Sequence, residues 1–152
     1  MKNLSILLII GILGLSSLVN AQTTDYIITG DGVKYYSKVR AGLSSTITGI
    51  NESGKERFSA DQVVAYSRDG RIYERVPVVV DNKETGRYAF MELITYRNGL
   101  KVYKHTIFHD ISNPVEEYLV YRNDGTYVVK FDGRNTTTLN QFFFHMHNLA
   151  GN

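Results

Sequence analysis

Five glycine turns divide most of this chain into short segments of strand-forming residues. The turns combine glycine with aspartate or asparagine and lie at 30–32, 69–70, 98–99, 123–125 and 132–133. Such sequences favour type I′ hairpin turns, because both central residues of that turn need a positive φ. The segments between the turns are rich in valine, isoleucine, tyrosine, threonine and phenylalanine, which are common in strands. The pattern therefore predicts a series of antiparallel hairpins.

The predicted strands are 25–29, 33–40, 44–50, 55–59, 62–67, 71–80, 87–97, 100–109, 116–122 and 126–132. Because the connections are short, strands that are neighbours in sequence are expected to pair. Residues 81–86 and 110–114 are expected to form longer loops. Pro77 cannot donate a ladder hydrogen bond, so its strand must lie at an edge, be split or contain a bulge. We expect a mainly β fold, an antiparallel meander that forms a barrel-like or strongly curved sheet.

The segment 87–97 is apolar on both faces of a strand. One face carries Ala89, Met91 and Leu93, and the other carries Tyr88, Phe90 and Ile94. A strand buried on both sides belongs in the centre of a sheet. The alternative is that one of these faces is a homodimer interface.

The C-terminal segment has helical periodicity. Its apolar residues recur at the spacing of one helix face: Leu139, Phe142, Phe143, Met146 and Leu149. Residues 136–138 are threonines that supply N-cap candidates, and Gly151 follows as a stop signal. This indicates an amphipathic helix over about 138–149, packed on the sheet. Residues 141–144 would also fit a strand, and this alternative determines where the neighbouring histidines point.

The N-terminus has the pattern of a cleavable signal peptide over residues 1–21. Lys2 precedes an apolar run, and Val19 and Ala21 occupy the −3 and −1 positions of a cleavage site, which leaves one domain over 22–152. The apolar run of 16 residues is shorter than the ~20 that span a bilayer, so no transmembrane span is expected after cleavage. We expect a secreted or periplasmic protein. The chain has no cysteine, so it has neither a disulfide nor a lipidated N-terminal cysteine.

The charges are nearly balanced, with 17 Lys+Arg against 15 Asp+Glu. A nucleic-acid-binding protein usually has a clear basic excess, so a nucleic-acid partner is not expected. The hydrophobic content of 43% is too high for an intrinsically disordered chain.

Basic and aromatic residues alternate on three predicted strands. The three sets are Lys34, Tyr36, Lys38 and Arg40, then Arg71, Tyr73 and Arg75, then Lys101, Tyr103 and His105. Members of each set are two residues apart and are expected to share a face. Such a face could stack sugars or bind anionic polymers, and the alternative is an ordinary solvated sheet face. The candidate ligand-binding residues are Tyr36, Tyr73, Tyr103 and His105.

The C-terminal histidines suggest a possible metal site. His145 and His147 share a face only if their segment is a strand, because two residues on a helix are separated by about 200°. With one of His105, His109 or Asp110 they could then bind Zn or Cu. No cysteine or Gly-x-Ser-x-Gly motif is present, so we assign no catalytic residue.

One stretch resembles a group of proteins. Residues 25–32, Asp-Tyr-Ile-Ile-Thr-Gly-Asp-Gly, are followed by Lys38-Val39 and by Val-Val-Ala-Tyr at 63–66. This pattern of Asp-x-Ile-x-Thr-x-x-Gly, a Lys-Val strand and a strand ending in Tyr before an Asx-Gly turn is similar to short exported bacterial β proteins of unknown function. It covers about residues 25–75, implies a β fold and assigns no residue roles.

The favoured hypothesis is an exported, non-catalytic binding or structural module of the cell envelope or extracellular space. It would act through its sheet face or a pocket under the helix, with a small molecule, a glycan or an envelope protein as partner. One alternative is a metal-binding protein that uses His145 and His147. A further alternative is a small hydrolase whose carboxylates meet only in the fold.

Overall fold

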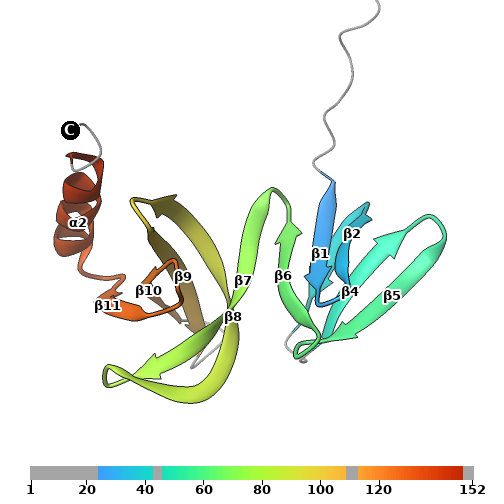
Figure 1. The fold of residues 1–152 in the computed structure, drawn as a ribbon, viewed down its shortest axis with the longest axis horizontal. Coiled ribbons are helices and arrows are strands. Elements are labelled where there is room, and N and C mark those ends of the chain that lie inside the picture. The colour runs from blue at the N-terminus through green and yellow to red at the C-terminus, as the bar shows by residue number, and fades with distance from the viewer. Residues whose placement is uncertain (1–23, 43–45, 109–112, 149–152) are drawn as a thin grey trace, which may run out of the picture.

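The computed structural model describes residues 24–42, 46–108 and 113–148. Its strands are β1 (Asp25–Thr29), β2 (Gly32–Tyr36), β3 (Lys38–Ala41), β4 (Thr46–Asn51), β5 (Gly54–Ser59), β6 (Val63–Arg68), β7 (Arg71–Val80), β8 (Lys83–Arg97), β9 (Leu100–Phe108), β10 (Pro114–Arg122) and β11 (Tyr127–Asp132). The helix α2 spans Thr136–Asn148 and lies at the opposite end of the molecule from β4 and β5 (Figure 1).

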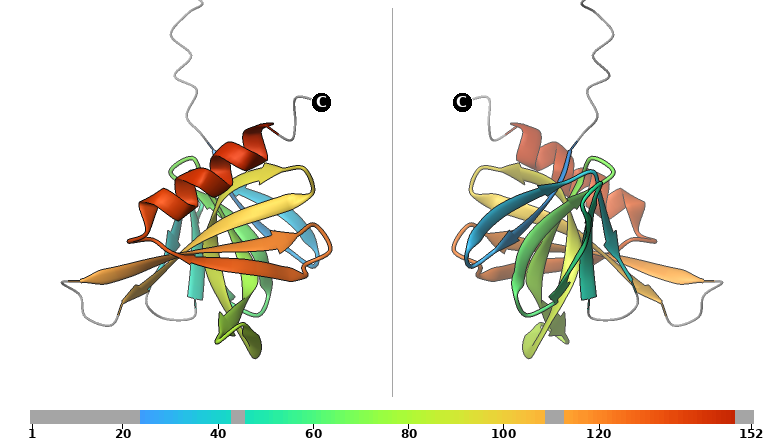
Figure 2. Two further views of the ribbon diagram at one scale, coloured as in Figure 1. Left: turned by 90° about the vertical axis from the view of Figure 1, so that its left-hand side faces the viewer. Right: turned by 90° about the vertical axis from the view of Figure 1, so that its right-hand side faces the viewer.

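The strands form two antiparallel sheets. One has eight strands in the order β11-β10-β9-β8-β7-β6-β1-β2, and the other has three in the order β3-β4-β5. The prediction of a mainly β fold with antiparallel pairing and a C-terminal helix is confirmed. The barrel-like form is wrong for the part of the chain described, because β2 and β11 remain the two edges of the large sheet and do not pair. Instead the large sheet is strongly twisted, with its two ends covered separately (Figures 1 and 2).

The predicted strand 33–40 is two strands, divided at Ser37. The backbone N–H of Ser37 donates to the Ile50 carbonyl at 3.0 Å, and its hydroxyl donates to the same carbonyl at 2.7 Å. The chain passes here from the large sheet to the small one. Tyr36 and Val39 both point into the core although they are three residues apart, which one regularly alternating strand does not allow. The predicted face therefore does not connect Tyr36 with the basic residues that follow Ser37.

The β7–β8 hairpin is longer than predicted. The predicted loop at 81–86 is wrong, because Asp81 and Asn82 make a tight turn with φ of 50° and 60° and β8 begins at Lys83. Asparagine and aspartate tolerate these angles better than other residues with a side chain. At Pro77 the strand remains continuous, and the pairing of β7 with β8 shifts register between Pro77 and Val79. Of the three possibilities predicted for this proline, the structure selects the bulge.

One face of the large sheet is covered at both ends and open in the middle. Residues directly opposite one another mark this face across six strands: Tyr66, Tyr73, Glu92, Lys104, Tyr118 and Phe131. At one end the small sheet covers it, and Tyr66 joins a core with Ile27, Val39 and Ile47. At the other end Tyr118 and Phe131 pack near α2.

The opposite face of the sheet holds a separate core. It contains Val76, Val79, Met91, Tyr103, Leu119 and Tyr121. The Tyr121 hydroxyl donates to the Pro77 carbonyl at 2.7 Å, so β7 and β10, which are not neighbours in the sheet, are joined across this core. Strand β8 contributes side chains to both cores. Met91 belongs to this core, and Phe90 packs against the core that contains Tyr66. The predicted central position of segment 87–97 is confirmed, but its apolar residues are not all buried, because Tyr88 and Ile94 are exposed.

Helix α2 packs on β9, β10 and β11 (Figure 2). Leu139 is buried, and Phe142 and Phe143 pack against Val102 and Val120. The N-cap is Asn135, whose side-chain oxygen accepts from the backbone N–H of Thr138 at 3.3 Å, so the helix begins two residues earlier than predicted. None of the helical structure described has the length and hydropathy needed to cross a membrane.

Candidate functional site

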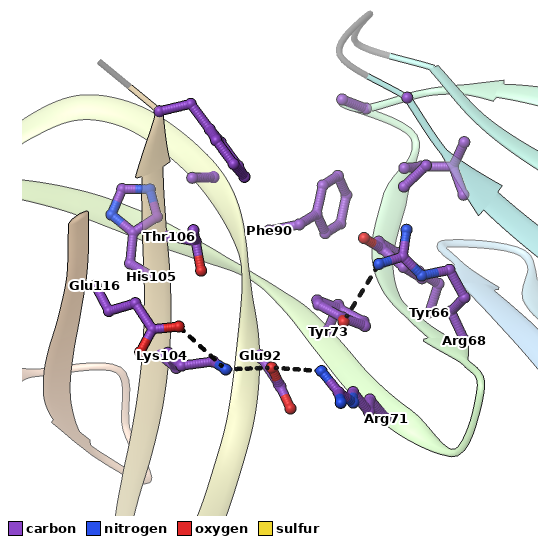
Figure 3. Close-up of a pocket in the computed structure, with 16 residues that line it drawn as sticks. Tyr66, Arg68, Arg71, Tyr73, Phe90, Glu92, Lys104, His105, Thr106 and Glu116 are labelled. Atoms are coloured by element: carbon purple, nitrogen blue, oxygen red, sulfur yellow. Dashed lines mark hydrogen bonds and ion pairs between the residues drawn. The ribbon is translucent and has the colours of Figure 1, made fainter. Parts of the chain in front are cut away.

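A cleft of about 920 Å³ lies on the open middle of the large sheet. Its lining residues come from seven strands and the segments after β3 and β5: Ala41, Gly42, Ile47, Ala60, Tyr66, Arg68, Arg71, Tyr73, Ala89, Phe90, Glu92, Lys104, His105, Thr106, Phe108 and Glu116. Figure 3 shows β6 and β7 on one side of the cleft and β9 and β10 on the other. The volume is within the range of small-molecule sites.

Alternating charges cross the cleft from strand to strand (Figure 3). Arg71 on β7 lies 3.7 Å from Oε2 of Glu92 on β8, and Nζ of Lys104 on β9 contacts the same oxygen at 3.2 Å. Nζ of Lys104 also lies 3.6 Å from Oε1 of Glu116 on β10. Side chains directly or diagonally opposite on adjacent strands are close enough to interact. This charge ladder, Arg71–Glu92–Lys104–Glu116, links four strands with opposite charges.

The ladder brings together two carboxylates that are far apart in sequence. Burial lowers the pKa of Lys104, but the hydrogen bond and charge of Glu92 and the charge of Glu116 outweigh it, so the net shift is upward. Lys104 therefore stays protonated and presents the same positive charge to both carboxylates.

An aromatic cluster forms the wall on the β6–β7 side. The rings of Tyr66 and Tyr73 stack with centroids 4.9 Å apart, and Phe90 contacts Tyr66 edge to face at 5.2 Å. The Arg68 guanidinium lies 5.2 Å from the Tyr73 ring centroid and donates to the Tyr73 hydroxyl at 3.4 Å. Burial raises the pKa of Tyr66 to about 12. The candidate residue Tyr73 lines the cleft, but its ring already packs against the Tyr66 ring and the Arg68 guanidinium.

Two other candidate residues, Tyr36 and Tyr103, lie in the cores and not in the cleft. Each is 4% exposed. The Tyr36 hydroxyl donates to Glu56 at 2.6 Å, and the Tyr103 hydroxyl donates to Glu74. Burial, followed by the hydrogen bond to glutamate, raises the pKa of each tyrosine. These two residues support the fold and are not available for ligand stacking.

His105, the fourth candidate, borders the cleft at β9. Side chains alternate along a strand, so its ring lies on the face of β9 away from Lys104 and Thr106 (Figure 3). It faces Glu117 on β10. Burial lowers the pKa of His105, and the charge of Glu117 acts in the opposite direction. Of the four candidates, the structure brings Tyr73 and His105 to one cleft, and only Tyr73 points into it.

The proposed metal ligands His145 and His147 lie on α2. The strand alternative, which their shared face required, is wrong because this segment is helical. His145 is exposed, and the side chain of His147 lies outside the described part of the structure. His109 and Asp110 also lie outside the described residues. Within 24–42, 46–108 and 113–148, no three His, Cys, Asp or Glu side chains gather in a group that could hold a metal ion.

The cleft contains residues that the sequence alone did not suggest, above all Arg68, Glu92 and Lys104. Arg68 and Arg71 flank an Asp-Gly turn, and the hairpin register derived from that turn would have placed them opposite each other. The glutamate and lysine could be located only from the order of four strands. No family model matches the sequence, and no curated protein or solved structure matches it significantly.

Proposed function

We propose that this chain is an exported, non-catalytic binding module of the cell envelope or extracellular space, and that it holds its ligand in the cleft. The signal-peptide pattern of residues 1–21 supports export. The cleft itself supports ligand binding. It combines a polar ladder with aromatic and aliphatic side chains in one concave site, as small-molecule sites do.

The observation that carries the proposal is the uneven covering of one sheet face. The small sheet covers this face on one side and α2 covers it on the other. Between them lie partly exposed groups of opposite character, such as Phe108, which is 60% exposed, and Arg71, whose side chain is also 60% exposed. A small molecule or a short glycan fits this site better than a flat protein surface would, because the site is concave.

The proposal is tested by native mass spectrometry of the full-length gene product purified from the envelope or medium of its own host. We expect a mass that matches residues 22–152, together with a bound small molecule that survives chelator treatment. Retention of residues 1–21 would refute export, and an adduct lost to the chelator would favour the metal-binding alternative.

A blocking variant ties such an adduct to the cleft. Thr106→Trp places a large ring on the cleft face of β9, and we expect it to abolish the adduct. The matched control is Val128→Trp, at an exposed position on β11 outside the cleft. An adduct that persists in Thr106→Trp, or a bare chain in every preparation, would contradict the proposal.

A further inference from the structure

Two arginines face each other inside the cleft. Arg68 and Arg71 are direct cross-strand partners at the end of the β6–β7 hairpin, and both line the cleft. Like charges directly opposite on neighbouring strands destabilise a sheet. Figure 3 shows their guanidinium groups on either side of Tyr73. A pair placed in this way is expected where a negatively charged group of a ligand binds between or beside them.

The carboxylates nearest to these two arginines do not satisfy them closely. Arg68 Nε lies 3.9 Å from Asp69, and Arg71 lies 3.7 Å from Glu92. Direct ion pairs elsewhere in the sheet are shorter, for example 2.8 Å between Lys101 and Glu74. A guanidinium binds carboxylate and phosphate oxygens through two parallel hydrogen bonds. Arg68 uses one N–H group on the Tyr73 hydroxyl, and the other N–H groups of the two arginines retain the capacity to bind an oxyanion.

The lining of the cleft changes from charged to apolar with distance from the hairpin end that carries Arg68 and Arg71. Glu92 on β8 pairs with Lys104 on β9. Phe90 on β8 and Phe108 on β9 lie on the side of this pair that is away from Arg71. Phe90 lies above the charge ladder in Figure 3. Ala41 and Ile47 also contribute to the lining. The cleft thus has a cationic end and an apolar end.

We propose that the ligand is an amphipathic anion, with a single carboxylate or phosphate head at Arg68 and Arg71 and an alkyl body over Phe90 and towards Phe108. This inference rests on the function proposed above and names the ligand class. The charged lining residues are three cations and two carboxylates, Arg68, Arg71, Lys104, Glu92 and Glu116. The resulting positive charge favours an anionic ligand over a zwitterion or a cation.

The test is calorimetric titration of the mature chain, 22–152, with probes below their micelle concentrations. The probes are dodecanoate, dodecyl phosphate and the neutral ester methyl dodecanoate, with acetate and inorganic phosphate as heads without a body. We expect both amphipathic anions to bind at least about tenfold more tightly than the neutral ester, the size of effect expected for a hydrogen bond to a charged group. Preference between the two anions identifies a fatty-acid-like or a phospholipid-like source.

Substitutions test which residues contact the head of the ligand and which contact its alkyl body. Arg68→Gln and Arg71→Gln should each weaken binding of the anions by about tenfold or more. Arg122→Gln, an exposed arginine outside the cleft, is the matched control and should bind normally. Glu92→Gln should strengthen binding because it removes a competing carboxylate. Phe108→Ala should weaken dodecanoate binding but not acetate binding. Far-ultraviolet circular dichroism confirms that each variant is folded.

Several outcomes would overturn the inference while the binding function stands. These are equal binding of the neutral ester, binding unaffected by both arginine variants, or inorganic phosphate binding as tightly as dodecyl phosphate. An adduct from the host that depends on the cleft, with no affinity for any of the probes, would also overturn it. Failure of both the host adduct and all probes would overturn the proposed function as well.

Discussion

The Tyr103 hydroxyl donates a hydrogen bond to Oε2 of Glu74, the same oxygen that the Lys101 ammonium contacts at 2.8 Å. Lysine and tyrosine two residues apart on β9 thus converge on one glutamate of β7. Lys34 and Tyr36 converge in the same way on Glu56 of β5. The alternation of basic and aromatic residues, which could indicate a ligand surface, is used at these two places to join strands that are not neighbours in a sheet.

We expect the Tyr103→Phe substitution to lower the free energy of unfolding by about 2 kcal/mol. The reason is that the carboxylate of Glu74 loses a hydrogen bond in a partly buried position. Urea denaturation measures the change. Tyr96→Phe is the control, because Tyr96 is 56% exposed and its substitution should leave the midpoint nearly unchanged. Equal effects of the two substitutions would contradict the structural role of Tyr103.

The buried tyrosines predict a loss of stability at alkaline pH. Burial and the hydrogen bond to Glu74 raise the pKa of Tyr103 above the ordinary value of 10.0, and burial raises that of Tyr66 to about 12. The unfolded chain therefore releases these protons first. The associated stability is fully present below pH 10 and falls as the pH rises above it. Denaturation at a series of pH values, followed by tyrosinate absorbance, should show unfolding and ionisation together. Ionisation of all tyrosines without unfolding would contradict this.

Gly49 is required because Tyr36 packs against its backbone. A Cβ atom at Gly49 would lie 2.3 Å from Cε1 of the Tyr36 ring, and Glu56 holds the hydroxyl of that ring. We expect Gly49→Ala to destabilise the fold by about 1–3 kcal/mol through overpacking. Thermal denaturation would detect this change.

The control for Gly49→Ala is Gly30→Ala, where an added Cβ has nothing within 4 Å. The reason for the effect is tested in the Tyr36→Ala background. Gly49→Ala should cost little there because the clashing ring is gone, and the coupling between the two substitutions measures the contact. An equal cost in both backgrounds would show that the clash is not the cause.

Asp25, at the start of β1, connects β1 by hydrogen bonds to β3 and to the β6–β7 turn. It is 4% exposed, and its carboxylate accepts from the backbone N–H of Val39 at 2.8 Å and of Asp69 at 3.1 Å. We expect Asp25→Ala to cost about 3 kcal/mol because two donors lose their acceptor. Asp25→Asn retains one acceptor oxygen and should cost less. Chemical denaturation distinguishes these variants, and equal costs would contradict a role for both oxygens.

We expect protonation of His105 to cause a moderate loss of stability in mild acid. Burial lowers its pKa below the ordinary 6.5, although Glu117 opposes the shift and Lys130 assists it. The neutral ring is favoured in the folded state, so its contribution is fully present above pH 6.5 and falls as the pH decreases below that value. The melting temperature of His105→Gln should depend less on pH between about 7 and 5.5 than that of the parent protein. An unchanged pH dependence would refute the assignment.

Much of the fold follows from local sequence. The Asx-Gly turns located four hairpins, β1–β2, β6–β7, β8–β9 and β10–β11, and the strand at Arg71–Val80 was predicted with its observed bounds. The errors arose where local rules leave two outcomes. The turn at Asp81 and Asn82 contains no glycine at its centre, and the break at Ser37 has no sequence signal because valine and tyrosine favour strands on both sides of it.

The candidate site was less predictable. Of the four residues suggested for ligand binding, Tyr36 and Tyr103 lie in cores, His105 points away from the cleft and Tyr73 lines it. The strand pattern correctly indicated which side chains share a face within a strand. It could not indicate whether a particular face is covered, because covering depends on segments far away in the chain.

The sequence by itself determined most of the strands, their antiparallel pairing and the amphipathic C-terminal helix, since turn chemistry and side-chain periodicity are local properties. Only the tertiary structure decided that the small sheet and α2 cover the two ends of one sheet face. That arrangement leaves Arg68, Arg71, Glu92 and Lys104 together in a cleft. The physical reason is that burial of side chains is a property of contacts between distant segments, and the same residue becomes a core or a site residue according to what packs over it.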